Sequence, residues 1–76
     1  MTDLIFYSNP GCHLCEQAAE LMEGRAKGYE MREVVIEGDL ALGYRYGVRI
    51  PVLKRGDTGA ELDWPFDAAD LEDFLA

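Results

Sequence analysis

The sequence predicts one α/β domain over residues 1–76, with elements in the order β-α-β, a short helix, then β-β-α. Three observations support this fold class. An apolar run, a segment of helical periodicity and a second apolar run follow one another, which is the pattern of a βαβ unit. A Gly-Asp-Thr-Gly turn signal at 56–59 joins two short strand-like segments into a hairpin. The last residues, from Asp67 onward, carry the signals of a capped helix.

The first three elements are read from apolar spacing. Residues 3–7 form a continuous apolar run, as in a strand that is covered on both faces, and a proline and a glycine then break it. Residues 12–24 predict a helix, because apolar residues recur along one face: Leu14, Ala18, Leu21 and Met22. We expect Leu14 to pack into the core or to line the rim of a cleft. Residues 29–36 predict the second strand.

Capping and turn residues mark the later elements. Asp39 is the expected N-cap of a short helix through Tyr44. Residues 50–55 predict a third strand that begins next to a proline, and residues 60–63 return as the fourth. The last helix is expected to begin with Asp67 as its N-cap and Asp70 in its first turn, with a staple between Phe66 and Leu71 and an apolar stripe of Leu71, Phe74 and Leu75.

Composition limits the classes of partner. Hydrophobic residues make up 49% of the chain, which argues against disorder. The formal net charge of −8 makes nucleic acid and anionic membrane surfaces poor partners. No apolar run approaches the roughly 20 residues of a membrane span, and the N-terminus does not resemble a signal peptide. We therefore expect a location in the cytoplasm. We also expect the chain to be a monomer.

The two cysteines, Cys12 and Cys15, have C-x-x-C spacing at the expected strand–helix junction. A bridge between them would close too small a loop to staple the fold, so a chemical role is favoured. A helix N-terminus favours a thiolate, which makes Cys12 the expected nucleophile and Cys15 the resolving thiol. Two other interpretations stay open. The pair could be ordinary core cysteines, or a dimer could hold zinc through Cys12, Cys15 and His13.

Two segments then resemble a known family. The first is FYSNPGCHLC at 6–15, and the second is YGVRIPVL at 46–53. Together with the element order, they resemble the thioredoxin fold in its small glutaredoxin form, and within it the short bacterial glutaredoxin-like proteins once classed as a domain of unknown function. The resemblance covers nearly the whole chain. It implies a mixed four-stranded sheet of order 2-1-3-4, with the first and last helices on one face and the middle helix on the other. It also implies a cis peptide bond between Ile50 and Pro51, facing the dithiol.

The resemblance also implies a substrate site around Pro51. There the backbone N–H and C=O of Ile50 would pair with an extended substrate. Arg49 would attract a substrate carboxylate, or would be a solvated surface arginine. His13 as a cation would stabilise the Cys12 thiolate, or would simply face solvent. Trp64 lies in a loop that the family geometry brings near the dithiol, where it would bind a partner or pack at the core edge.

The sequence departs from glutathione-using glutaredoxins at several positions. Those proteins usually carry a lysine where Asn9 stands, and Cys-Pro-Tyr-Cys where this chain has Cys-His-Leu-Cys. They usually have Thr-Val-Pro in place of residues 49–51, and Gly-Gly where Trp64-Pro65 stands. Each change removes a charge, a stacking group or space from the glutathione site. Only Asp67 resembles a retained element. Glutathione therefore stays open as a co-substrate, but these departures count against it.

We therefore predict a thiol–disulfide oxidoreductase or electron carrier with no bound cofactor and no metal. Its expected partners are a disulfide-containing protein, or a small-molecule thiol or disulfide, together with a dithiol reductant. The first alternative is a redox-sensing interaction module whose partner affinity follows the state of the dithiol. The second alternative is the dimeric metal-binding protein.

Overall fold

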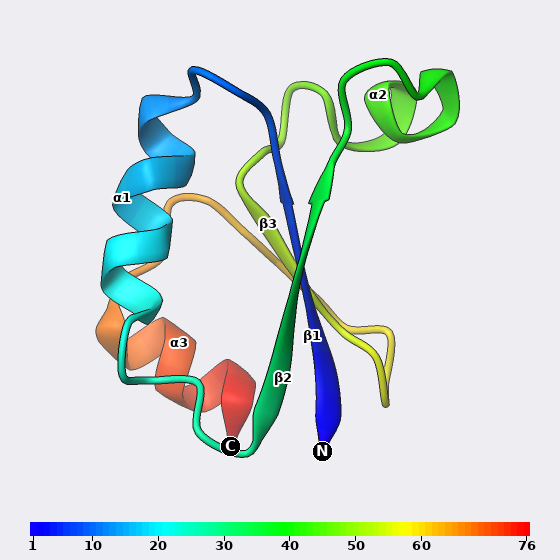
Figure 1. Ribbon diagram of the computed structural model, residues 1–76. Helices are drawn as coiled ribbons and strands as arrows, with labels where there is room; N and C mark the ends of the chain where they lie inside the picture. The colour runs from blue at the N-terminus through cyan, green and yellow to red at the C-terminus, as the bar shows by residue number, and fades with distance from the viewer.

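The structure is a computed structural model that describes residues 1–76. It contains one four-stranded sheet and three helices, as Figure 1 shows. Their bounds are β1 Thr2–Ser8, α1 His13–Met22, β2 Tyr29–Val35, α2 Leu40–Tyr46, β3 Val52–Arg55, β4 Glu61–Asp63 and α3 Ala68–Leu75. The strand order is β2-β1-β3-β4, with β1 parallel to β2 and the other pairs antiparallel. The predicted fold class and strand order are confirmed.

Strand β1 is central because it pairs on both edges and is covered on both faces. Leu4 and Phe6 point to the face that carries α1 and α3, where they join one buried cluster. Ile5 and Tyr7 point to the opposite face and contact a second cluster. Side chains of a strand alternate between the two faces of the sheet. A strand buried in this way must be apolar nearly throughout, which is what its sequence shows.

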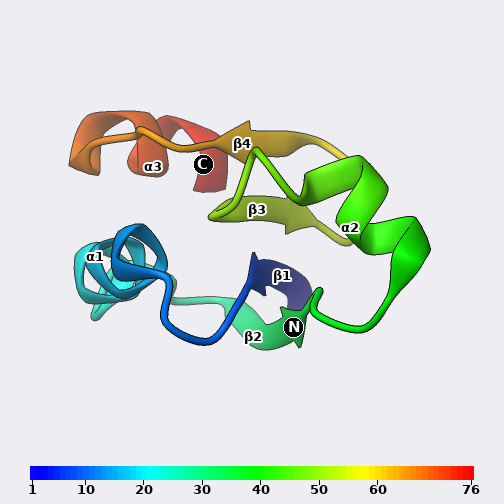
Figure 2. The ribbon, with the colours of Figure 1, turned by 90° about the horizontal axis from the view of Figure 1, so that it is seen from above.

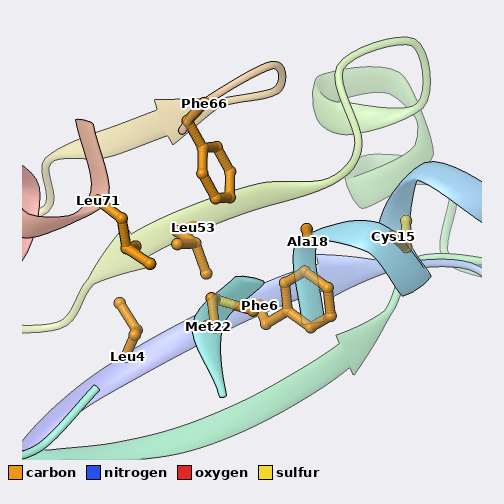
Figure 3. Packing of buried hydrophobic residues seen from close by; sticks show 8 residues of the cluster. All are labelled: Leu4, Phe6, Cys15, Ala18, Met22, Leu53, Phe66 and Leu71. Carbon is orange, nitrogen blue, oxygen red and sulfur yellow. The ribbon is translucent and has the colours of Figure 1, made fainter. Parts of the chain in front are cut away.

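The molecule has three layers. Figure 2 shows α1 and α3 on one side of the sheet and α2 on the other. The larger cluster fills the space between the sheet and the two helices. Figure 3 shows its eight buried residues: Leu4, Phe6, Cys15, Ala18, Met22, Leu53, Phe66 and Leu71. Under α2, Tyr46 stacks on Tyr7 with ring centroids 4.1 Å apart. The dithiol segment is thus anchored in the larger cluster through Cys15.

Two sequence expectations need correction. Leu14 does not pack into the core, since it is 45% exposed; Cys15, Ala18 and Met22 form the buried face of α1. Leu14 lies at the margin of that face in the first turn. Strand β3 begins at Val52 rather than at residue 50. The peptide N–H of Ile50 donates to the Tyr46 carbonyl at 3.0 Å, and proline has no N–H to offer the sheet.

Both predicted aspartate caps are present. The Leu42 N–H donates to Asp39 Oδ1 at 3.0 Å, and the Asp70 N–H donates to Asp67 Oδ1 at 2.8 Å. Asp70 returns the contact by accepting from the Asp67 N–H at 3.1 Å, which completes a capping box. No helix is long and apolar enough to cross a membrane.

Candidate functional site

Cys12 and Cys15 form a disulfide at the junction of β1 and α1. Their Cα atoms are 5.2 Å apart, which lies within the usual range for bonded cysteines. A turn precedes the pair, because the Cys12 N–H donates to the Asn9 carbonyl at 3.3 Å. The sequence breakers after β1 therefore place the first cysteine directly at the start of the helix.

Cys12 is the N-cap residue of α1. Its Sγ accepts a hydrogen bond from the Cys15 N–H at 3.1 Å, one of the N–H groups that a helix start leaves unpaired. This contact and the helix dipole both favour a negative charge on Cys12 Sγ. Cys12 is half-buried, whereas Cys15 is 5% exposed within the core cluster. The geometry thus suits attack by Cys12 and a sheltered role for Cys15.

A cleft of about 220 Å³ borders both cysteines. Ser8 and Glu33 line it, and the Ser8 hydroxyl donates to Glu33 Oε2 at 2.8 Å. Asn9 lines it too, and Asn9 Oδ1 is buried without a hydrogen-bond partner. Sequence reasoning missed Ser8 and Glu33. Glu33 could have been found from the parallel pairing of β1 with β2. That pairing sets Glu33 opposite Phe6, so the Glu33 side chain lies on the face of the sheet that carries Cys15.

The segment around Pro51 meets the loop of Trp64. The Trp64 N–H donates to the Pro51 carbonyl at 3.2 Å, and Pro51 itself is buried. The Ile50–Pro51 and Trp64–Pro65 peptide bonds are both cis. The Trp64 ring meets Phe66 edge-on, with centroids 5.0 Å apart. Trp64 therefore lies at the core edge, and Phe66 is buried in the core cluster together with Leu71.

Three of the predicted site residues surround one core cluster. Cys12, Ile50 and Trp64 are each partly buried and pack against the cluster that contains Cys15. The tertiary structure therefore brings segments that are distant in sequence to the same region as the dithiol. Their roles toward a substrate stay predictions.

Only one of the two Ile50 backbone groups that were expected to pair with a substrate is free to do so. Its N–H already donates to the Tyr46 carbonyl, whereas its C=O accepts no hydrogen bond within the chain. The N–H is engaged because the chain after α2 continues for one more helical turn before it reaches Pro51. A substrate strand would therefore meet one free backbone group at Ile50 rather than two.

Arg49 is neither freely solvated nor unpaired. Its guanidinium donates to Asp63 through two bonds of 3.0 and 2.7 Å and to Glu61 at 2.7 Å, and it lies 5.2 Å from the Tyr46 ring centroid. Hydrogen bonding to Asp63, and then to Glu61, raises the pKa of Arg49. The Arg49 hydrogen bonds also hold the pKa of Asp63 below its usual range. A substrate carboxylate would have to compete with these two acids for Arg49.

His13 faces solvent, with a side chain that is 90% exposed. Its Nδ1 lies 3.4 Å from Glu16 Oε2, one turn along α1. The solvent-facing interpretation therefore describes its position, and a role at the Cys12 thiolate stays a prediction. The chain does not bring three His, Cys, Asp or Glu side chains within reach of one metal ion.

The fold and the cysteine pair define a small thioredoxin-fold domain with a dithiol site at the start of its first helix. The family model of the Glutaredoxin-like domain (DUF836) matches residues 3–76, so the chain belongs to this glutaredoxin-like family. No curated protein matches the chain at a significant level.

Solved structures agree with this assignment. The X-ray structure of target protein XcR50 from X. campestris is 44% identical, with a TM-score of 0.84 over 95% of this chain and 93% of that chain. The solution structure of the same protein has a TM-score of 0.81 over 99% and 92% of the two chains. Protein Ne2328 from Nitrosomonas europaea is 28% identical, with a TM-score of 0.81 over 99% of this chain and 92% of its own. None of these names states an activity.

Proposed function

We propose that the protein is a thiol–disulfide oxidoreductase in which Cys12 is the nucleophile and Cys15 the resolving thiol. The observation that carries this proposal is the hydrogen bond from the Cys15 N–H to Cys12 Sγ at the start of α1. In the reduced protein the same donor would stabilise the Cys12 thiolate, which is the form that attacks a disulfide. The disulfide of the structure is the oxidised state of this couple.

The reaction balances over two exchange steps. The Cys12 thiolate attacks one sulfur of the substrate disulfide, and the other sulfur leaves as a thiolate that takes up a proton. Cys15 then loses its proton and attacks Cys12 Sγ, which breaks the mixed disulfide and releases the second substrate thiolate. Two electrons pass from the protein dithiol to the substrate. An external reductant returns two electrons to the Cys12–Cys15 disulfide.

A dithiol reductant fits this chain better than glutathione does. Asn9 supplies no positive charge for a glutathione carboxylate. Trp64 and Pro65 add bulk where glutathione-using proteins have glycines. Trp64 also packs against Phe66, so that bulk is held in place. We place the reaction in the cytoplasm, where a dithiol is kept reduced.

Cysteine variants test the proposal and the roles of the two thiols. With a dithiol reductant, the wild-type protein is expected to reduce insulin or a model mixed disulfide above the background rate. Cys12→Ser should fall to background because the attacking sulfur is lost. Cys15→Ser should accumulate the mixed disulfide on Cys12, visible by intact mass spectrometry, because the resolving thiol is lost.

Equal rates for the wild type and Cys12→Ser would refute the proposal. Replacing the dithiol reductant with glutathione tests the choice of reductant, and we expect slower turnover with glutathione. Turnover also separates an oxidoreductase from a redox-sensing interaction module, which would bind its partner with little turnover.

A further inference from the structure

Helix α2 carries an apolar stripe on its outer side. Leu40 and Tyr44 on α2, and Val48 in the turn that follows it, are 92%, 97% and 102% exposed, and they are spaced four residues apart. Residues at this spacing share one face of a helix. Exposed apolar side chains that are grouped in this way mark interaction sites more often than scattered ones do.

The side chains of this stripe do not contribute to the packing of the domain. The inner side of α2 packs on the sheet through Tyr46, a member of the second core cluster, and through Leu42, which packs against that cluster. On a helical projection these two residues lie opposite Leu40 and Tyr44. The helix is therefore attached by one face, and its other face carries the exposed Leu40 and Tyr44. Figure 2 shows α2 on the side of the sheet away from α1 and α3.

A cleft of about 450 Å³ runs beside the stripe. Leu40, Tyr44 and Asn9 are among the residues that line it, and Gly43 contributes only backbone. Glycine inside a helix costs about 1 kcal/mol relative to alanine. Nothing lies within 4 Å of the position that a Cβ would take at Gly43. Packing therefore does not require glycine there, and the missing side chain leaves the cleft open.

This cleft adjoins the dithiol. Asn9 borders both the cleft beside α2 and the cleft beside the two cysteines. Its carbonyl accepts the Cys12 N–H. Figure 1 shows the loop before α1 and helix α2 at the same end of the sheet. A segment that docked along α2 would therefore approach Cys12.

The charge at this cleft is negative. Glu37 and Asp39 are exposed and line it. No lysine or arginine lines it. The two arginines of α2 and of the segment after it have other contacts: Arg45 lies over the inward-facing Tyr46 ring at 5.6 Å, and Arg49 is paired with Asp63. The chain as a whole carries a net charge of −8. A positively charged partner fits this rim, because opposite charges across an interface favour association.

We propose that the cleft beside α2 and the apolar stripe together bind a segment of a disulfide-bearing protein substrate. We call this surface the α2 groove, and its cleft is lined by Glu37, Asp39, Leu40, Gly43 and Tyr44. That segment carries an apolar anchor side chain flanked by lysine or arginine. The inference rests on the proposed function, for which it names the class of substrate. The apolar anchor enters the cleft above Gly43, the basic residues face Glu37 and Asp39, and the substrate disulfide lies toward Cys12.

A binding experiment tests the groove without any redox chemistry. The probe is a fluorescent, cysteine-free peptide with one tryptophan or leucine anchor and three lysines, and its partner peptide has glutamates in place of the lysines. Fluorescence anisotropy with the oxidised protein is expected to show about tenfold tighter binding of the lysine peptide, equivalent to about 1.4 kcal/mol. Moderate salt should weaken that binding. Equal affinity for the two peptides would overturn the proposal.

Variants locate the binding surface. Gly43→Leu fills the cleft and Tyr44→Ser removes part of the stripe, so each is expected to weaken binding of the lysine peptide by about tenfold. Met31→Ser is the matched control. Met31 lies on β2 and is 41% exposed. It lines a different cleft together with Phe6 and Met22, on the face of the sheet opposite α2. Circular dichroism confirms that each variant is folded. Unchanged binding by both groove variants would overturn the proposal.

Kinetics connect the groove to the substrate. The readout is the ratio of kcat/KM for a disulfide-linked form of the lysine peptide to kcat/KM for bis(2-hydroxyethyl) disulfide. This ratio is expected to fall about tenfold in Gly43→Leu and to stay at the wild-type value in Met31→Ser. An unchanged ratio in Gly43→Leu would overturn substrate docking. A wild-type dimer that Tyr44→Ser dissociates in sedimentation would instead assign the stripe to a second copy of the chain and overturn the proposal.

If the wild-type protein reduced no disulfide above background but still bound the lysine peptide selectively, the redox function would be rejected and the α2 groove would still be a peptide-binding site. Full turnover without selective binding of the lysine peptide would reject the α2 groove and support the redox function. The two proposals can therefore fail separately.

Discussion

Tyr46, the last residue of α2, connects this helix to strands β1 and β4 through the contacts of its side chain. Its ring stacks on Tyr7, and its hydroxyl donates to Glu61 Oε2 at 2.6 Å. Burial, and then the hydrogen bond to Glu61, raises the pKa of the Tyr46 hydroxyl, so the group stays a neutral donor. The Tyr46 backbone carbonyl accepts from Arg49 and Ile50. The residue therefore holds the chain that leads into Pro51.

Tyr46→Phe isolates the hydroxyl contact. The substitution keeps the ring stack but removes a donor from a carboxylate, and it is expected to lower the free energy of unfolding by about 1.5–3 kcal/mol. Urea denaturation monitored by circular dichroism measures the change. Tyr44→Phe is the control, because Tyr44 is 97% exposed and should change stability by less than about 0.5 kcal/mol. Equal effects of the two substitutions would contradict this account.

Individual residues also differ in how far their roles can be predicted from the sequence. The cysteine pair is visible because its spacing is local and its chemistry is specific. Ser8 and Glu33 are 25 positions apart, and they meet only because β1 and β2 are adjacent and parallel. Arg49 was predicted as a site residue, but its partners Glu61 and Asp63 come from a strand twelve or more positions away.

At the scale of the element, helix starts were the most predictable features. N-caps are encoded within four residues, so Asp39 and Asp67 could be identified without knowledge of the fold. Cys12 occupies the same position at the start of α1, and there the cap is also the candidate nucleophile. The buried face of α1 was harder to assign. It depends on which side of the helix meets the sheet, and Leu14 lies just outside it.

The capping box of α3 provides a test at this scale. Asp67→Ala removes the side chain that accepts the Asp70 N–H and should lower the free energy of unfolding by about 1 kcal/mol. Thermal and urea unfolding measure it. Asp73→Ala serves as the control in the same helix. Asp73 lies near the C-terminal end, where an acid is unfavourable to the helix dipole, so its removal should be neutral or slightly stabilising. Similar losses for the two variants would show that the cap is unimportant.

At the scale of the whole molecule, one ion network ties the α2 end of the chain to the hairpin. Arg49, from the segment after α2, contacts both Glu61 and Asp63 on β4. The hydrogen bond from Tyr46, and then that from Arg49, lowers the pKa of Glu61. The hydrogen bonds from Arg49 lower the pKa of Asp63 as well. The network braces the segment before Pro51 against the strand that leads to Trp64.

These shifts predict a specific loss of stability in acid. A carboxylate whose folded-state pKa is depressed stabilises the fold above its unfolded pKa, and that contribution is lost as pH falls through the folded pKa. With unfolded values near 4, the loss should begin at about pH 5 and continue below pH 4. The excess stability of the wild type over Arg49→Gln should therefore shrink across this window in urea unfolding at a series of pH values.

A comparison pair tests whether this pH dependence belongs to Arg49. Arg32 and Asp3 form a more exposed contact at 3.7 Å, and exposed pairs contribute little. Arg32→Gln should therefore keep the wild-type pH profile. A constant difference between the wild type and Arg49→Gln from pH 7 to pH 3 would refute the proposed linkage.

The sequence by itself determined the features that depend on local spacing: the order of elements, the dithiol at a strand–helix junction, the hairpin turn and the helix caps. The resemblance to the glutaredoxin-like family added the strand order. Only the tertiary structure decided which groups at the site are free. It showed that the Ile50 N–H and Arg49 are already engaged, that Leu14 is outside the core, and that α2 presents Leu40 and Tyr44 outward. The physical reason is that burial and hydrogen bonding between distant residues are properties of packed layers, which local periodicity does not encode.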